Sequence, residues 1–264
     1  MLGAIIGDVV GSRFEWNNLK SKDFELFHAD CHITDDSVLT VAVADALLRH
    51  TAGTDSLTVT AAHCLREYGC RYPLAGYGAR FMTWLFRKNA GPYNSLGNGS
   101  AMRVGPAGFW GQTLKECLTC ARDVTMVTHN HPEGVKGAEA TTTAIWLGRQ
   151  GAAGKEIREF IDTCYYPLNF SLADIRDSYT YDITCAGTVP QAVVAVAEAT
   201  DFEDAIRNAI SLGGDSDTLA AIAGSIAEAC FGVPEDMAAA VRPYVPDELW
   251  QVMERFYQQA RTAE

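Results

Sequence analysis

Two acidic clusters in this sequence have the composition of a cation site. The first is Thr34-Asp35-Asp36 and the second is Asp215-Ser216-Asp217-Thr218, so each combines two carboxylates with a threonine hydroxyl. Oxygen ligands without histidine or cysteine favour magnesium, manganese or calcium over zinc or copper. The alternative is that each cluster only caps the helix that follows it, as Asp, Ser and Thr commonly do.

A further carboxylate, Glu15, follows the first apolar segment and could join the two clusters. The candidate cation ligands are then Glu15, Thr34, Asp35, Asp36, Asp215, Asp217 and Thr218. Gathered at one place without cations, these carboxylates would repel one another at a large cost in free energy, whereas two divalent cations would nearly balance their charge. We therefore expect one shared site for divalent ions that prefer oxygen ligands: magnesium, manganese or calcium.

The residues around the second cluster indicate how its carboxylates could meet. Residues two apart on a regular helix point roughly 200° apart, so Asp215 and Asp217 can share a ligand only where the backbone is irregular. Gly213 and Gly214 directly precede them and permit such a backbone at the start of the helix. The helix that follows, Asp217 to Cys230, is rich in Ala and Gly, which predicts a central helix with close neighbours.

A glycine-rich segment, Gly97-Asn98-Gly99-Ser100-Ala101-Met102-Arg103, is a candidate ligand loop. A turn of this kind that runs into a helix offers free backbone amides and a positive dipole end to a phosphate or diphosphate. Its spacing matches neither a Walker loop nor a dinucleotide fingerprint, and a plain turn is the alternative. Arg103 would be either a phosphate contact or an ordinary surface arginine of the helix.

The segment Thr128-His129-Asn130-His131-Pro132 places two histidines beside the start of a helix. No third histidine or cysteine stands nearby at zinc-ligand spacing, and Pro132 suits the first position of a helix. This pattern predicts a helix start, with His129 as a candidate substrate contact.

The remaining patterns predict an all-α fold. Strand patterns are nearly absent, while Gly and Pro gather at short joints between helical patterns. We therefore expect one domain over residues 1–264, a compact and mostly orthogonal helical bundle. The expected helices are Ala4 to Arg13, Val38 to Leu48, Ser56 to Tyr68, Gly78 to Lys88, Leu114 to Val127, Glu133 to Arg149, Glu156 to Tyr165, Val189 to Ala199, Phe202 to Ser211, Asp217 to Cys230 and Asp247 to Ala260.

Composition narrows the class of protein. Hydrophobic residues make up 48% and charged residues 20%, as in ordinary globular proteins. The apolar N-terminal segment has no basic start and is interrupted by Asp8, so we expect no secretory signal, no membrane segment and a cytoplasmic location. The eight cysteines are irregularly spaced, and we interpret them as free thiols. The net charge of −12 argues against a protein that binds nucleic-acid backbones.

Taken together in this order, the motifs resemble those of the ADP-ribosylglycohydrolase family, which includes the dinitrogenase-reductase-activating glycohydrolase and the ADP-ribosylarginine and ADP-ribosylserine hydrolases. The resemblance runs from Met1 to about Gly232. It is carried by Gly3-Ala4-Ile5-Ile6-Gly7-Asp8-Val9-Val10-Gly11 through Glu15, Thr34-Asp35-Asp36-Ser37, Gly97 to Arg103, Thr128-His129 and Gly213-Gly214-Asp215-Ser216-Asp217-Thr218. Two departures are small: Ser37 stands where the family often has Thr, and Ser100 where some members have Gly.

The resemblance implies an all-α fold with a binuclear magnesium or manganese centre, held by the candidate ligands named above. It also implies a role for the glycine-rich segment and for the residue at position 129. Around the diphosphate and distal ribose it would place Gly97, Asn98, Gly99, Ser100 and Met102. On the nucleotide side of the site it would place His129.

The activity implied by the resemblance is hydrolysis of the glycosidic bond between ADP-ribose and an acceptor, with release of ADP-ribose. The expected catalytic residues are Asp35 and Asp36, which would position metal and ribose, and Glu15, which would take a proton from water; an aspartate of either cluster is the alternative base. The acceptor stays open between arginine, serine, a nucleic-acid end and a small molecule. Alternatives are a hydrolase of a small conjugate such as O-acetyl-ADP-ribose, a non-catalytic ADP-ribose-binding module and a purely structural protein. We expect a monomer.

Overall fold

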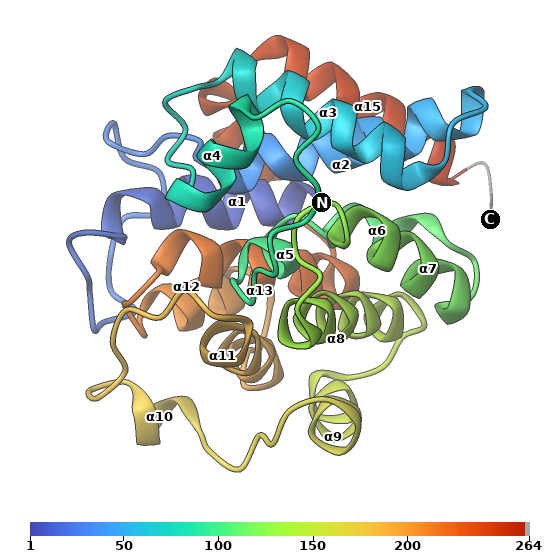
Figure 1. Ribbon diagram of the computed structural model, residues 1–264. Coiled ribbons are helices and arrows are strands. Elements are labelled where there is room, and N and C mark those ends of the chain that lie inside the picture. The colour runs from blue at the N-terminus through green and yellow to red at the C-terminus, as the bar shows by residue number, and fades with distance from the viewer. Residues whose placement is uncertain (262–264) are drawn as a thin grey trace.

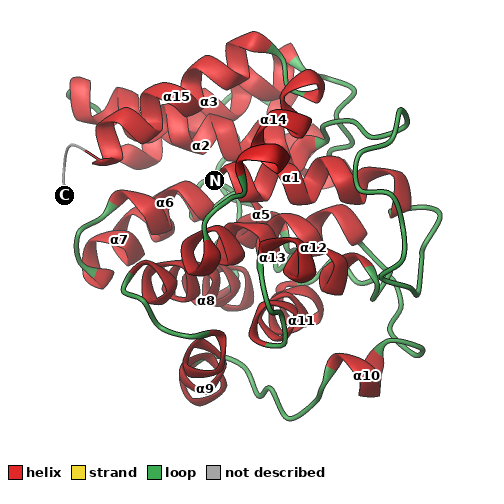
Figure 2. Cartoon of the chain, turned by 180° about the vertical axis from the view of Figure 1, so that it is seen from behind, coloured by secondary structure: helices red, strands yellow, loops and turns green. Residues whose placement is uncertain are grey.

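The computed structural model describes residues 1–261, and this part of the chain is helical (Figures 1 and 2). Its only extended pairing is an isolated antiparallel bridge between Gly97 and Thr184. The α-helices are α1 (Leu2–Gly11), α2 (Asp35–Ala52), α3 (Leu57–Arg71), α4 (Ala79–Phe86), α5 (Gly99–Met102), α6 (Gly105–Trp110), α7 (Leu114–Thr125), α8 (Pro132–Arg149), α9 (Gly154–Cys164), α10 (Leu172–Ile175), α11 (Cys185–Ala197), α12 (Phe202–Ile210), α13 (Ser216–Phe231), α14 (Glu235–Val241) and α15 (Asp247–Arg261), with short 3₁₀ helices η1 (Ser12–Phe14) and η2 (Arg242–Tyr244).

Helices α1 and α13 lie at the centre of the molecule and pack against each other (Figure 1). The layer on one side contains α2, α3 and α15, and the layer on the other contains α8, α11 and α12. In Figure 1 the helices α8, α9 and α11 are seen nearly end-on, whereas α2 and α3 run across the view. Helices therefore cross at large angles, which confirms the predicted orthogonal bundle.

Glycines at every fourth position of α1 let its backbone contact the backbone of α13. Gly3 and Gly7 lie on one face of α1, since residues four apart on a helix share a face. A Cβ atom added to Gly7 would lie 2.0 Å from the carbonyl oxygen of Ala220, and one added to Gly3 would lie 2.1 Å from that of Gly224. The contact brings the end of α1 close to the start of α13, since a Cβ on Gly11 would lie 2.6 Å from the Cα of Asp217.

The expected helices are present, with ends shifted by a few residues. Shifts of four residues occur at the end of α2, which is Ala52 rather than Leu48, and at the start of α11, which is Cys185 rather than Val189. Helix α11 contains Pro190 in its interior. Helices α6, α10 and α14 were not expected from the sequence, because segments of four to seven residues are too short to show a helical period.

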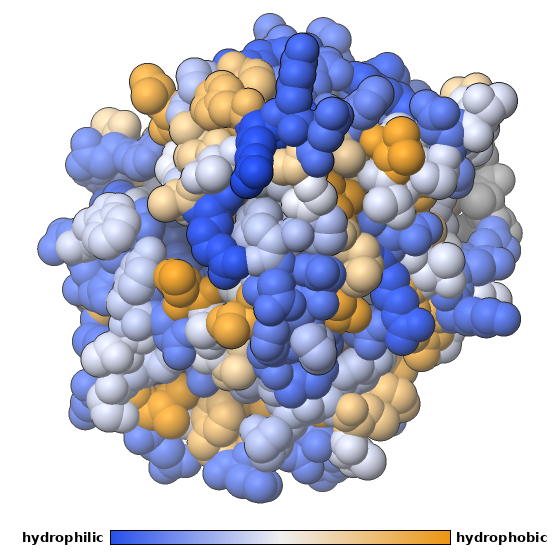
Figure 3. Space-filling model, viewed as in Figure 1, coloured by the Kyte–Doolittle hydropathy of each residue, from blue (hydrophilic) through white to orange (hydrophobic). Residues whose placement is uncertain are grey.

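The other composition-based expectations can be compared with the structure. All eight cysteines are free, as expected. Within residues 1–261 there is no helix with both the length and the apolar character that crossing a membrane requires. The face shown in Figure 3 is largely hydrophilic, with hydrophobic residues in small separate patches.

Candidate functional site

The predicted site residues meet at a cleft of about 530 Å³. The cleft lies where η1, the start of α2, the loop before α4, helix α5 and the start of α13 converge. Those that line it are Glu15, Thr34, Asp35, Asp36, Gly97, Asn98, Gly99, Met102, His129, Asp215, Asp217 and Thr218. Segments far apart in the sequence are thus brought to one place, and Ser100 is the predicted site residue that does not line the cleft.

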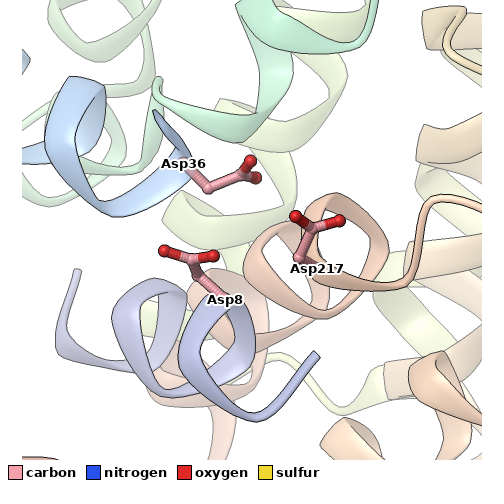
Figure 4. Close-up of side chains that lie close together, drawn as sticks. All are labelled: Asp8, Asp36 and Asp217. Carbon is pink, nitrogen blue, oxygen red and sulfur yellow. The ribbon is translucent and has the colours of Figure 1, made fainter. Parts of the chain in front are cut away.

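A first carboxylate group combines one residue from each of three helices: Asp8 from α1, Asp36 from α2 and Asp217 from α13. Figure 4 shows the three side chains pointing toward one another, and each offers a carboxylate oxygen within 4.8 Å of the others. Thr218 donates a hydrogen bond of 3.2 Å to Oδ2 of Asp36. Oδ1 of Asp36 is buried and has no hydrogen-bond partner within residues 1–261. A buried carboxylate oxygen without a donor is suited to a cation.

Asp8 is a residue of this group that sequence reasoning missed as a site residue, since it was noted as an interruption of an apolar segment and as part of the first motif. It is fully buried and its carboxylate accepts hydrogen bonds from the amides of Thr34 at 2.9 Å and Ser37 at 3.0 Å. The hydroxyl of Thr34, at 2.7 Å, and that of Ser37 also donate to it. Asp8 therefore fixes the start of α2, and with it Asp36. The available sequence signal was a lone acid within an apolar helix, because Asp is almost never buried unless it is paired.

A second carboxylate group contains Glu15, Asp215 and Asp217, again with oxygens within 4.8 Å of one another. Asp217 thus belongs to both groups. The preceding turn has the irregular backbone expected of the glycine pair, with φ of 67° at Gly213 and 71° at Gly214. Asp35 lines the same cleft but belongs to neither group.

One of the two clusters caps its helix and the other does not. Thr34 is the N-cap of α2 and its hydroxyl accepts from the amide of Asp36 at 3.2 Å. Asp215 occupies the N-cap position of α13 but makes no capping hydrogen bond. Its Oδ2 instead accepts from the side-chain amide of Asn98 at 2.7 Å, which ties the glycine-rich segment to the second carboxylate group.

Asn18 connects the Glu15 segment to the turn before α13, and sequence reasoning did not identify it. Its amide nitrogen donates to the carbonyls of Phe14 at 2.7 Å, Glu15 at 2.9 Å and Gly214 at 2.9 Å. Its amide oxygen accepts from the backbone N–H of Gly214 at 2.7 Å. Asn18 therefore holds the two segments that carry the second carboxylate group in one relative position.

Burial and mutual repulsion raise the pKa values of the clustered carboxyl groups. The pKa of Asp217 is raised well above its ordinary value by burial and by the charges of Asp36 and Asp215. The pKa of Asp36 is raised by burial and by Asp8 and Asp35, and that of Asp35 reaches about 8 for the same kind of reason. Divalent cations would remove this repulsion. The donor set, oxygen alone, and the free Oδ1 of Asp36 fit such ions.

The glycine-rich segment divides between the cleft and the protein interior. Gly97, Gly99 and Met102 line the cleft. Asn98 donates to Thr188 at 3.1 Å as well as to Asp215. Ser100 is fully buried, and its hydroxyl donates to the carbonyl of Gly134 at 2.7 Å, so it supports the segment from behind.

The sequence-based interpretation of Arg103 as a surface arginine is wrong. Only 1% of Arg103 is exposed, and the residue lines the inner side of the cleft. Short helix α5 ends one residue before it and turns it inward, so helical periodicity could not predict its burial. The helix start at Pro132 is confirmed, because His131 caps α8 by accepting from the amide of Glu133 at 3.0 Å.

Fold and site together define an all-α protein with clustered carboxylates beside a glycine-rich segment. The model of the ADP-ribosylglycohydrolase family matches residues 1–264. The chain belongs to this family and is an enzyme of it, which confirms the resemblance seen in the motifs.

Individual relatives are similar over different shares of the chain. The ADP-ribosylhydrolase ARH3 of Homo sapiens is 24% identical over 98% of this chain and 93% of its own length. The ADP-ribosylarginine hydrolase Tri1 of Pseudomonas putida is 28% identical over 53% of this chain and 40% of its own length. A solved structure of an ADP-ribosylglycohydrolase-related protein complex superposes with a TM-score of 0.72 at 22% identity, covering 98% of this chain and 97% of that chain, which establishes the shared fold.

Proposed function

We propose that this protein hydrolyses the glycosidic bond between ADP-ribose and an acceptor, an ADP-ribosylated protein side chain such as arginine or serine, and releases ADP-ribose. The proposal is carried by one observation: Asp36, Asp217, Glu15 and Asp215, which belong to two carboxylate groups that share Asp217, line the same cleft as Gly97 and Gly99. Cations suit the ribose hydroxyls, and backbone amides suit a diphosphate. Family membership and the named ADP-ribosylhydrolases support the ADP-ribose part of the substrate.

The cofactors we propose are two divalent cations, Mg²⁺ or Mn²⁺. Asp36, Thr34 and Thr218 would contribute to one position, Glu15 and Asp215 to the other, and Asp217 to both. Bound there, the cations would supply the positive charge that orients ribose hydroxyls and stabilises oxygens gaining negative charge. They would also reverse the negative field of an acidic cleft that must accept a diphosphate.

Glu15 is the proposed general base. It is half-buried, and the hydroxyl of Tyr181 donates to its Oε1 at 3.1 Å. Burial and the charge of Asp215 raise the pKa of Glu15, although the hydrogen bond from Tyr181 opposes this shift. A base with a raised pKa holds a proton better near neutral pH. Glu15 would take a proton from water as the water oxygen bonds to the anomeric carbon and the bond to the acceptor breaks. That proton would then pass from Glu15 to the departing acceptor, which restores the carboxylate. Asp35, which belongs to neither carboxylate group, is the alternative base.

Exposed apolar side chains at the cleft favour a polypeptide acceptor over a small molecule. Leu74 is 97% exposed, Trp16 80% and Ile183 56%, and all three line the cleft. Large exposed apolar groups beside a binding site are typical of surfaces that contact a macromolecule. The net charge of −12 further disfavours a nucleic-acid acceptor.

The test is release of ADP-ribose from arginine-linked, serine-linked and nucleic-acid-end-linked substrates and from O-acetyl-ADP-ribose, with Mg²⁺, with Mn²⁺ and with chelator. We expect release from a protein-linked substrate only when metal is present, reduced about 10- to 100-fold in Asp36→Asn. Asp55→Asn, an exposed loop carboxylate, is the matched control and should retain wild-type release. Release from O-acetyl-ADP-ribose alone would instead identify a small-conjugate hydrolase. ADP-ribose binding without any release would identify a binding module.

A further inference from the structure

Arg103 is a buried cation for which no ion pair is found among the described residues. Its guanidinium is 1% exposed, and its hydrogen bonds go from Nη2 to the hydroxyl of Thr128 at 2.6 Å and to Nδ1 of His129 at 3.4 Å. Burial lowers the pKa of Arg103 to about 10, so the group is still charged at neutral pH. Burying a charge without a counter-charge is costly, which indicates that this arrangement has a use beyond packing.

The side chains of Arg103, Thr128 and His129 are joined by hydrogen bonds, and we call this set the relay. The chemistry of the groups fixes which of them donates. A guanidinium only donates, so Thr128 Oγ1 and His129 Nδ1 both accept from Arg103. The hydroxyl of Thr128 also lies 2.7 Å from Nδ1 of His129. Because Nδ1 accepts, it carries no proton, and the proton of a neutral His129 must sit on Nε2.

The protonated nitrogen of His129 lies against the glycine-rich segment. A Cβ atom added to Gly97 would lie 3.7 Å from Nε2, and one added to Gly99 would lie 3.6 Å from it. His129 is itself 4% exposed and lines the cleft. The Nε2–H group is therefore held where the loop leaves room for a ligand, and side chains at positions 97 and 99 would narrow that space.

We propose that Arg103 and Thr128 are positioning residues that hold His129 as the neutral Nε2–H tautomer, so that His129 donates a fixed hydrogen bond to an oxygen of ADP-ribose. His129 then contributes to recognition and not to acid–base catalysis. The identity of the ligand rests on the proposed function, whereas the tautomer rests on the relay alone. A donor fixed in advance loses little entropy when the ligand binds.

The charges that face His129 also keep it neutral. Besides Arg103, Arg80 of α4 is the other cation that acts on it, and the ring of Tyr93 lies 6.0 Å from the imidazole between ring centroids. Burial first, and then the charges of Arg103 and Arg80, lower the pKa of His129 well below its ordinary value. An ordinary imidazole titrates near pH 6.5, so His129 would stay neutral at pH values where an unperturbed imidazole gains a proton.

The direct test is two-bond ¹H–¹⁵N NMR of the histidine rings in the full chain, from about pH 5.5 to about pH 8, a range that spans the ordinary imidazole pKa. The chain has six histidines, and loss of one signal in His129→Gln assigns the ring. We expect the Nε2–H tautomer, unchanged over the whole range. A proton on Nδ1, or a titration near the ordinary value, would overturn the proposal.

A pair of variants tests the contribution of the relay to binding. Thr128→Val keeps the shape of the side chain and removes the hydroxyl, whereas Thr128→Ser keeps the hydroxyl. We expect Thr128→Val to bind ADP-ribose about fivefold more weakly, with an affinity that now varies with pH, and Thr128→Ser to bind as the wild type does. The measurement is calorimetric titration with ADP-ribose, with melting temperatures to confirm folding.

The outcomes separate this proposal from the proposed function. Wild-type affinity in Thr128→Val, at every pH, would remove the positioning role of the hydroxyl. Failure of the wild-type protein to bind ADP-ribose would overturn both the proposed function and the ligand role of His129. The NMR measurement would still test the tautomer independently.

Discussion

At the scale of single residues, Asp217 connects the two carboxylate groups. It contributes to the Asp8–Asp36 group and to the Glu15–Asp215 group, and its raised pKa reflects both sets of neighbours. A carboxylate shared in this way is suited to bridge two cations. Its substitution should therefore disturb both positions, whereas loss of Glu15 should disturb one.

Asn18 gives a prediction at the same scale. Asn18→Ala removes the hydrogen bonds that join the Glu15 segment to Gly214, so Glu15 and Asp215 are no longer held together. Since a hydrogen bond contributes about 1 kcal/mol, we expect divalent-cation affinity to fall about fivefold or more. The measurement is calorimetric titration with Mn²⁺. Asn17→Ala, at the exposed neighbouring position, is the control; equal affinities of the two variants would contradict the assigned role.

Sequence reasoning identified the acidic clusters, the glycine-rich segment and His129 at the cleft because their chemistry is local. Paired carboxylates, a glycine-rich turn and a histidine before a helix are visible without a fold. Asp8, Asn18 and Arg103 were missed or misjudged because their roles depend on partners distant in the sequence: Asp8 is satisfied by Thr34 and Ser37, and Arg103 by Thr128. No spacing rule reports contacts of this kind.

At the scale of elements, the crossing of α1 and α13 sets the geometry of the cation site. Asp8 follows Gly7 on α1, and Asp217 lies in the first turn of α13 beside Gly11. The backbones touch because the glycines carry no side chain. The sequence predicted a central α13 from its small residues, but it did not show that α1 would be the partner, since that pairing depends on the matching faces of two distant segments.

Gly7→Ala tests this crossing. The new Cβ would lie 2.0 Å from a carbonyl oxygen of α13, and backbone cannot move aside as a flexible side chain can. We expect the free energy of unfolding to fall by about 3 kcal/mol or more, measured by urea denaturation. Gly91→Ala is the control, because its Cβ would meet nothing within 4 Å, and we expect a change of about 1 kcal/mol or less. Equal stability of the two variants would show that α1 is not packed as described.

At the scale of the whole molecule, the buried carboxylates couple cation binding to folding and pH. A carboxyl group whose pKa is raised in the folded state contributes stability that is full below its unfolded value and is lost as pH rises through its folded value. For Asp35 this window runs from 3.8 to about 8, and Asp36 and Asp217 shift in the same direction. The metal-free protein should therefore lose stability from these groups as pH rises through that window.

We expect the melting temperature to be higher with Mg²⁺ than with chelator. This difference should widen as pH rises from about 5 to about 8, because protons compete with cations for the same carboxylates. The lowered pKa of His129 acts in the opposite direction, costing stability as pH falls, but it affects both samples and cancels in the difference. Asp36→Asn should narrow the difference at high pH. A difference of constant size would contradict the coupling.

Several whole-molecule expectations stay predictions: the single domain over residues 1–264, of which 262–264 lie outside the described residues, the monomeric state and the cytoplasmic location. The fold class was predictable because helices of ten or more residues show their period in the sequence. Oligomeric state and location depend on surfaces and partners that no motif in the chain encodes.

The central claim is that the carboxylates of Glu15, Asp36, Asp215 and Asp217, with the hydroxyls of Thr34 and Thr218, hold two divalent cations. The most direct measurement is the number of Mn²⁺ ions bound per chain, counted by electron paramagnetic resonance in wild type and in Asp217→Asn. The account predicts two ions per wild-type chain and loss of both, or a drop in affinity of about 10- to 100-fold, in the variant. No stoichiometric binding to the wild type, or unchanged binding to Asp217→Asn, would contradict it.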